Sequence, residues 1–290
     1  MILGVLLAFA TALGYSVRAL MYKLVEGYGF KRPVIQLSYR FLSIPVSLLL
    51  LSVFKDNSVN QGLNLEGLIL LGVAGIIGYV ADVSYYTGFS RVEMSLATLF
   101  CRLSPIISLL LSYLFLRELP NSSAIIGIFI IVLASLWLSR SLHKVPGLKY
   151  DRKAIGFIVG SQIFYNINSI IINQICAMSS EISFIFYFSV IASCFFLIDA
   201  IRSKSYHSLR GKSFKAYGML LIFSVISFLP FLTAVYSYRM LMLPIAYALV
   251  SFSLVFTVIL GYLFLGEREG LIQKAITGVA MLVGGYLAVT

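Results

Sequence analysis

The sequence predicts an all-α integral membrane protein, in which ten transmembrane helices form two inverted five-helix repeats around a central cavity. The first observation behind this prediction is composition: of 290 residues, 60% are hydrophobic and 11% are charged, and the mean hydropathy is +0.98. An ordinary soluble domain carries about 25% charged residues, so the composition excludes that class. The other two observations are ten long apolar segments and an internal repeat.

The ten apolar segments account for nearly the whole chain. A helix needs about 20 mostly apolar residues to cross a bilayer, and the segments that reach this length are 1–24, 33–54, 66–89, 94–116, 120–139, 154–177, 182–201, 214–238, 243–265 and 271–290. The first segment has no basic stretch before it and no small-residue cleavage motif after it, so we expect a retained span rather than a signal peptide. Cys101, Cys176 and Cys194 all fall inside spans without metal-type spacing, which favours packing; we expect no metal and no cofactor.

The basic residues divide unequally between the two sides of the membrane. Loops after the first, third, fifth, seventh and ninth spans define what we call the basic side, and their sixteen Lys and Arg residues are Lys23, Lys31, Arg32, Arg91, Arg140, Lys144, Lys149, Arg152, Lys153, Arg202, Lys204, Arg210, Lys212, Lys215, Arg268 and Lys274. The opposite side has Lys55, Arg117 and Arg239. Short cytoplasmic loops carry the excess of Lys and Arg, so we expect the basic side in the cytoplasm of a prokaryotic plasma (inner) membrane and both termini outside. The net charge of +11 is thus explained by topology and phospholipid headgroups rather than by nucleic acid.

An internal repeat divides the chain into two halves. "YLFLRE" at 113–118 returns as "YLFLGE" at 262–267, and Tyr15 matches Tyr165 at nearly the same offset. The basic linker 140–153 separates a first repeat, 1–139, from a second, 154–290. Because each half has an odd number of spans, the second half enters the membrane inverted, as in many secondary transporters.

The segments that carry a family resemblance lie in both halves. They are "GVLLAFATALGYS", "YRFLSIPVSLLLL", "YYTGFSRVEMSLATLFCRLSPIISLLLSYLFLRELP" and "IAYALVSFSLVFTVILGYLFLGEREGLIQKAITGVAMLVGGYLAV". Together they resemble the drug/metabolite transporter superfamily in its ten-helix, EamA-like form, and the paired Y-L-F-L-x-E is the most specific element. The resemblance implies a central cavity, alternating access and a metabolite or drug as cargo. Characterised ten-helix members usually keep both termini in the cytoplasm, whereas the loop charges here favour the opposite orientation.

Four ionisable residues lie inside the predicted spans, where an isolated charge costs about 2.5–3.5 kcal/mol on insertion scales. They are Arg18, Arg40, Asp82 and Arg102. With a rise of about 1.5 Å per residue, all four lie roughly 9–12 Å from the basic side. We therefore predict that they share one site.

Polar and aromatic side chains at helical spacing extend this predicted site. Tyr15 and Tyr79 belong to the polar faces of the first and third spans, and the polar, uncharged sixth span contributes Gln162, Tyr165, Asn166 and Asn168. Pseudo-symmetry places Asn168 opposite Arg18. The full set of predicted substrate-binding residues is thus Tyr15, Arg18, Arg40, Tyr79, Asp82, Arg102, Gln162, Tyr165, Asn166 and Asn168.

A structural role for the charged residues is an open alternative. Asp82 could neutralise one arginine in a buried pair, and Arg18 could extend to the interface; for Arg18 the two interpretations are equally favoured. With three arginines facing one carboxylate, at least one positive charge is left over, and we favour binding roles for Arg40 and Arg102. The excess of Arg suits an anionic or carboxylate-bearing cargo.

The function predicted from these features is secondary transport of a small polar metabolite, anionic or zwitterionic, such as an amino acid or a phosphorylated or carboxylate compound. A lipid flippase or a channel of the same architecture is the alternative. A membrane-embedded transferase is less well supported, because His143 and His207 lie in basic loops without catalytic spacing. Partners are expected to be the cargo and membrane lipids, and the internal pseudo-symmetry makes a monomer sufficient. Proton coupling through Asp82 is a further hypothesis.

Overall fold

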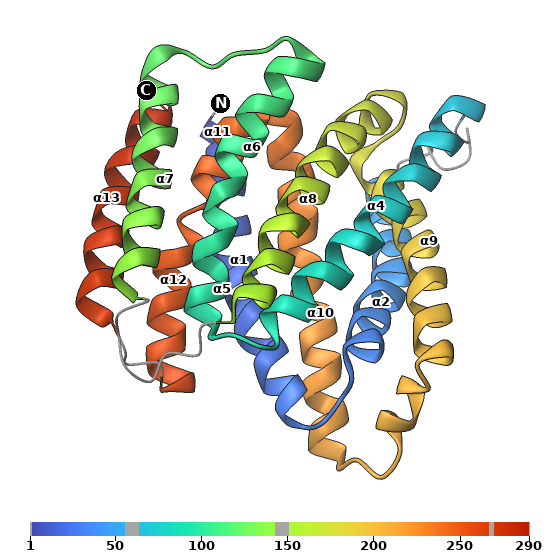
Figure 1. Ribbon diagram of the computed structural model, residues 1–290. Coiled ribbons are helices and arrows are strands. Elements are labelled where there is room, and N and C mark those ends of the chain that lie inside the picture. Colours follow the sequence, from blue (N-terminus) through green and yellow to red (C-terminus); the bar gives the residue numbers. More distant parts are fainter. Residues whose placement is uncertain (1, 56–63, 143–150, 267–269, 290) are drawn as a thin grey trace.

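The computed structural model describes residues 2–55, 64–142, 151–266 and 270–289. Every regular element within these ranges is helical, as Figure 1 shows. Residues 143–150 of the predicted linker, with Lys144 and Lys149, lie outside the described residues, as do Glu267 of the repeat and Arg268.

The helices follow the ten predicted segments closely. They are α1 (Ile2–Gly27), α2 (Arg32–Val53), α4 (Leu65–Phe89), α5 (Met94–Phe100), α6 (Ser104–Leu111), α7 (Ser122–Leu142), α8 (Arg152–Met178), α9 (Glu181–Arg202), α10 (Phe214–Met240), α11 (Leu243–Val250), α12 (Ser253–Leu260) and α13 (Leu271–Val289). In the described ranges, nine helical segments are long and apolar enough to cross a membrane, and α7 supplies a shorter apolar stretch, Ser122–Leu138. The prediction of an all-α membrane protein with about ten spans is confirmed.

Polar side chains at the helix starts explain several of these boundaries. The side chains of Asn64, Asp151, Ser180 and Ser213 accept hydrogen bonds from backbone N–H groups in the first turns of α4, α8, α9 and α10. Such caps satisfy donors that have no partner inside the helix. These four spans therefore begin at a short polar residue that caps the first turn.

The packing of the helices follows the predicted twofold pseudo-symmetry. The first and eighth spans, α1 and α10, pack together, and so do the third and sixth, α4 and α8. The twofold relation between the halves carries each span onto the one five spans away, and it exchanges these two pairs. The pairs α2–α9 and α7–α13 map onto themselves and form opposite edges of the bundle (Figure 1). Each half thus packs mainly on the other, which is the arrangement expected of inverted repeats.

The fourth and ninth spans are broken helices, a feature that hydropathy did not predict. A 3₁₀ turn, Cys101–Leu103, separates α5 from α6, and residues 251–252 separate α11 from α12. The breaks are pseudo-equivalent because they lie 150 residues apart. Broken helices are tolerated at membrane depth only where other groups satisfy the released backbone.

The repeated hexapeptide has the same conformation in both halves. Each copy forms a π-helical turn, Ser112–Leu116 and Gly261–Leu265, that ends in a left-handed residue, Arg117 (φ 55°) and Gly266 (φ 69°). The sequence similarity at 113–118 and 262–267 therefore encodes one shared way of ending a span.

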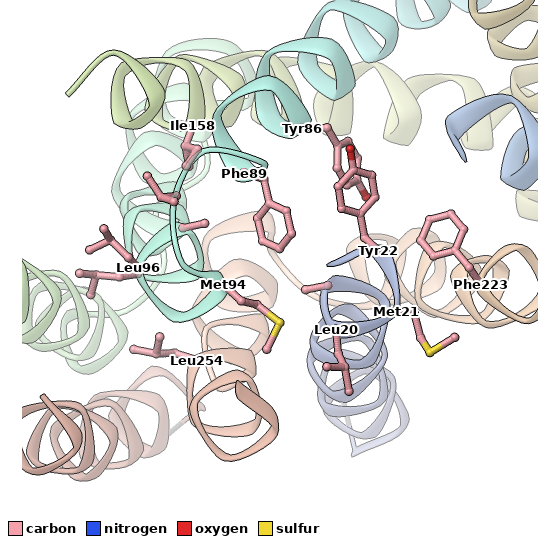
Figure 2. Close-up of a cluster of buried hydrophobic side chains, with 14 of the residues drawn as sticks. Leu20, Met21, Tyr22, Tyr86, Phe89, Met94, Leu96, Ile158, Phe223 and Leu254 are labelled. Atoms are coloured by element: carbon pink, nitrogen blue, oxygen red, sulfur yellow. The ribbon is translucent and has the colours of Figure 1, made fainter. Parts of the chain in front are cut away.

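A buried aromatic cluster lies toward the basic side of the bundle. Tyr22 of α1 packs on Tyr86 and Phe89 of α4, with ring centroids 4.4 and 5.7 Å apart, and on Phe223 of α10 at 6.2 Å. Figure 2 shows these rings together with Met94 of α5. We call Tyr22, Tyr86, Phe89 and Phe223 the aromatic plug, because they close the centre of the bundle at this end.

Candidate functional site

A cavity lies at the centre of the bundle, between the aromatic plug and a second buried group around Tyr238 and Tyr247. Its volume is about 170 Å³, measured as the space that the centres of water molecules can occupy. Both halves of the chain line it, since α1, α2 and α4 face α8, α10 and the broken span α11–α12 across it. In inverted-repeat transporters, substrate sites lie at the interface between the two repeats.

Eight of the ten predicted site residues line this cavity. They are Tyr15, Arg18, Arg40, Asp82, Arg102, Gln162, Tyr165 and Asn168. The four ionisable residues of the first half therefore line one cavity; their role in binding stays a prediction. The sixth span faces them across the cavity.

Tyr79 and Asn166 are not among the lining residues. The Tyr79 ring packs on the outer helix α9, with centroids 5.6 Å from Phe195 and 5.1 Å from Phe196. Asn166 is buried between helices, where its Nδ2 donates to Ser104 Oγ at 3.1 Å and to the Gln162 carbonyl at 2.7 Å. Helical spacing identified the faces of these spans but not which neighbour each side chain meets.

Asp82 is held by donors on both of its oxygens. Arg40 Nη2 donates to Oδ2 at 2.7 Å and the Tyr165 hydroxyl donates to Oδ1 at 2.6 Å. Arg40 and Asp82 are 4% and 2% exposed, so this is a buried ion pair that joins α2, α4 and α8. The structural alternative for Asp82, neutralisation of one arginine, matches this geometry.

Aromatic rings enclose the Arg40 guanidinium. Its Cζ lies 4.6 Å from the ring centroid of Tyr39, 4.9 Å from that of Phe188 and 5.0 Å from that of Phe231. Cations over ring faces are attracted by the ring quadrupole. Arg40 is thus both paired and caged, and its charge is compensated by the protein itself.

Arg102 donates hydrogen bonds to groups at both helix breaks. Its Nε donates to the Thr98 carbonyl at 3.0 Å, Nη1 to the Val250 carbonyl at 3.0 Å and Nη2 to Ser253 Oγ at 2.7 Å. In a continuous ninth span the Val250 carbonyl would accept from Leu254 N, but that N–H donates to Ser251 instead. Arg102 therefore satisfies a backbone group that the break releases, and it joins the breaks of the two halves.

In the described part of the chain, Arg18 keeps two donor atoms without a partner, and Arg40 keeps one, its Nε. The Cζ of Arg18 lies 4.6 Å from the ring centroid of Tyr39 and 5.6 Å from that of Tyr86. Its Nε and Nη2 atoms are buried and have no hydrogen-bond partner among the described residues. Neither Arg18 nor Arg102 pairs with a carboxylate among the described residues, but the donors of Arg102 are used on Thr98, Val250 and Ser253, whereas two donors of Arg18 are left for a ligand.

The aromatic wall of the cavity was missed by the search for ionisable residues. Phe231 and Tyr238 of α10 line it with Tyr247 of α11, and the rings of Tyr238 and Tyr247 stack at a centroid distance of 5.2 Å. The Tyr247 hydroxyl lies 2.7 Å from Ser169 Oγ. The spacing of seven residues between Phe231 and Tyr238, two helical turns, was the signal that could have found this wall.

The aromatic plug and a lysine lie on the side of the cavity that faces the basic side. Lys23 Nζ donates to the carbonyls of Phe89 at 2.7 Å and Val92 at 3.0 Å. These bonds tie the end of α1 to the turn between α4 and α5. Packed side chains of α1, α4 and α10 therefore lie between the cavity and the basic side.

The likeness to solved structures shows the fold. One crystal structure matches with a TM-score of 0.70 at 13% sequence identity, covering 98% of this chain and 96% of the other. No curated protein matches the chain. A family model described as the EamA-like transporter family matches twice, over residues 2–140 and 152–290.

Proposed function

Because the chain belongs to the EamA-like transporter family, part of the drug/metabolite transporter superfamily, and is thus an integral membrane transporter, we propose that it is a secondary transporter of a small polar metabolite. The metabolite is anionic or zwitterionic and crosses by alternating access. The cavity between the two halves is the proposed binding site.

The observation that supports this proposal is that two donor atoms of Arg18 have no partner in the part of the chain that the structure describes. A positive charge inside a membrane protein is normally paired, yet Nε and Nη2 of this guanidinium have no hydrogen-bond partner among the described residues. An anionic group of a cargo would supply the missing partner. A cationic drug would instead need an uncompensated carboxylate.

The inverted halves and the aromatic plug support alternating access. In the described conformation, cargo would reach the basic side only after Tyr22, Phe89 and Phe223 separate. Inverted repeats can exchange conformations, so the opposite state would close the far end and open this one. A channel of the same architecture would need an open path through the bundle.

We place the protein in a prokaryotic plasma membrane, with the basic side in the cytoplasm and both termini outside. The loop charges support this orientation. We propose that the chain works as a monomer, because the second half supplies the cavity wall that a partner subunit otherwise would.

Coupling to protons through Asp82 is not part of this proposal. Both oxygens of Asp82 accept hydrogen bonds, from Arg40 and Tyr165. Its carboxylate is thus committed to contacts that join α2, α4 and α8, and we expect it to hold these three helices together throughout the cycle.

A lipid flippase or a channel remains the alternative function, and a transferase is the weaker one. His207 lies in the turn Ser205–Leu209 between α9 and α10 and is not among the described residues that line the cavity, and His143 lies outside the described residues. Arg18 favours transport of a soluble anion over lipid transport or group transfer. It offers a buried positive charge rather than a groove that is open to lipid.

Substrate counterflow in proteoliposomes tests the proposal. The panel contains amino acids, phosphorylated metabolites, carboxylates and lipophilic cations, and the variants are Arg18→Gln and, as a matched control, Arg239→Gln. Arg239 is a surface residue paired with Glu181 at 3.4 Å, so its replacement removes the same charge away from the cavity.

Saturable counterflow of an anionic or zwitterionic solute, lost in Arg18→Gln and kept in Arg239→Gln, is the expected result. Flux that neither saturates nor exchanges would indicate a channel. Counterflow of cations that both variants retain would refute the binding role of Arg18.

A further inference from the structure

Resting on the proposed function, we propose that the cargo is an organic carboxylate without an ammonium group, and that it carries a ring-sized apolar body. The inference narrows the anionic or zwitterionic class to net anions. Three features of the cavity support it: its charge, the free edge of Arg18, and its aromatic wall.

The charge of the lining favours a net anion over a zwitterion. Among the described lining residues, Asp82 is the one acid and Arg18, Arg40 and Arg102 are the bases. Both oxygens of Asp82 already accept from protein donors. A cargo ammonium would therefore enter a positively charged cavity without an uncommitted carboxylate to receive it, and an unpaired buried charge is unfavourable.

The available edge of Arg18 matches a carboxylate. In a guanidinium, the N–H of Nε and one N–H of Nη2 point the same way, and they can donate two parallel hydrogen bonds to one carboxylate. These are the two atoms of Arg18 that have no partner. They are covered in this conformation, so a small shift of the neighbouring Tyr39 or Tyr86 ring must accompany their pairing.

The rest of the wall suits an apolar ring. Tyr85, Phe231, Tyr238 and Tyr247 line the cavity, and aromatic pairs prefer offset or edge-on contacts that a planar cargo could join. The volume of about 170 Å³ has room for on the order of ten water molecules. A solute of about ten non-hydrogen atoms therefore fits this space.

Cation binding by these rings is the competing interpretation. Of the wall rings, Phe231 already faces the Arg40 guanidinium together with Tyr39 and Phe188, and Tyr238 and Tyr247 stack on each other. An aromatic amine would also be repelled by Arg18. The competing interpretation nevertheless predicts a distinct result in the experiment below.

Four probes that differ by one group each test the inference. They are 3-phenylpropionate, L-phenylalanine, which adds the ammonium group, phenethylamine, which lacks the carboxylate, and propionate, which lacks the ring. Binding of labelled 3-phenylpropionate to the purified full-length protein is measured, with the others as competitors. Binding is preferred to uptake because protonated carboxylic acids cross bilayers unaided.

We expect saturable binding of 3-phenylpropionate. L-Phenylalanine and propionate should compete at least about tenfold more weakly than unlabelled 3-phenylpropionate, and phenethylamine should not compete. Arg18→Gln should abolish binding, Arg18→Lys should retain part of it, and Arg239→Gln should leave it unchanged. Size-exclusion profiles matching the wild type establish that each variant is folded.

Equal or tighter binding of L-phenylalanine, competition by phenethylamine, equal binding of propionate, or no binding of 3-phenylpropionate would each overturn the inference. Arg18-dependent counterflow of a zwitterion or a phosphorylated solute would still support the proposed transport function. The two proposals can therefore fail separately.

Discussion

Replacing Arg102 by glutamine should destabilise the protein, whereas the same replacement at Arg18 should not. Arg102 makes three hydrogen bonds, at 3.0, 3.0 and 2.7 Å, and two of their acceptors are backbone carbonyls, those of Thr98 and Val250. Arg18 has ring contacts with Tyr39 and Tyr86, and two of its donors have no partner. The two variants therefore remove the same charge from opposite environments.

The expected magnitudes follow from these contacts. Hydrogen bonds inside membrane proteins average about 0.6 kcal/mol, and those to charged groups reach about 1.5–3 kcal/mol in general. At about 0.6 to 1.5 kcal/mol for each of the three bonds, Arg102→Gln should lose about 2–5 kcal/mol. Arg18→Gln loses about 0.5–2 kcal/mol of cation–π attraction, offset by removal of an incompletely paired buried charge, for a net change near zero.

Thermal unfolding of the purified protein in detergent measures this difference. At roughly 2 °C per kcal/mol for a chain of this size, Arg102→Gln should lower the midpoint by roughly 4–10 °C and Arg18→Gln by about 2 °C or less. Ser253→Ala, which removes one acceptor of Arg102, should give an intermediate fall. Equal falls for Arg18→Gln and Arg102→Gln, or an unchanged midpoint for Arg102→Gln, would refute the assignment of structural and binding roles.

Three further predictions concern the buried ion pair, helix contact and topology. Asp82→Asn should lower the free energy of unfolding by about 3–5 kcal/mol, because it leaves the Arg40 charge buried and unpaired, and adding Arg40→Gln should recover part of that loss. Denaturation of the single and double variants measures both effects. Additive losses would contradict the pairing. Gly88→Ala should destabilise the packing of α4, because a Cβ there would lie 2.4 Å from a backbone oxygen of α8. The control Gly72→Ala on the same helix meets nothing within 4 Å and should gain up to about 1 kcal/mol of stability. Equal midpoints of thermal unfolding for the two variants would count against the close α4–α8 contact. A C-terminal alkaline phosphatase fusion should be active and a C-terminal green fluorescent protein fusion dark, as expected for a terminus outside the cytoplasm; the reverse pattern would invert the proposed topology.

Hydropathy predicted the spans to within a few residues because the bilayer restricts the conformations that an apolar segment can adopt. Without water, backbone groups must bond within the segment, so a long apolar run becomes a helix whatever surrounds it. The predicted span 214–238 corresponds to α10, Phe214–Met240, for example. The repeated hexapeptide likewise indicated inversion, because span number and direction depend only on chain order.

The breaks in the fourth and ninth spans had no comparable signal. The segments 94–116 and 243–265 are apolar throughout, and a continuous helix would satisfy the same hydropathy pattern. Pro105 begins α6 just after the first break, but Pro230 lies inside the unbroken α10. Proline alone therefore does not predict where a span breaks.

Composition and distance along single helices were enough to predict the fold class, the inversion of the halves and the common depth of Arg18, Arg40, Asp82 and Arg102. Which arginine keeps donors for a ligand depends instead on how the two halves pack. The partners of Arg102 are Val250 and Ser253, about 150 residues away, and hydrogen bonds require approach to about 3 Å. That proximity is created by the packing of one half on the other, which no local pattern records.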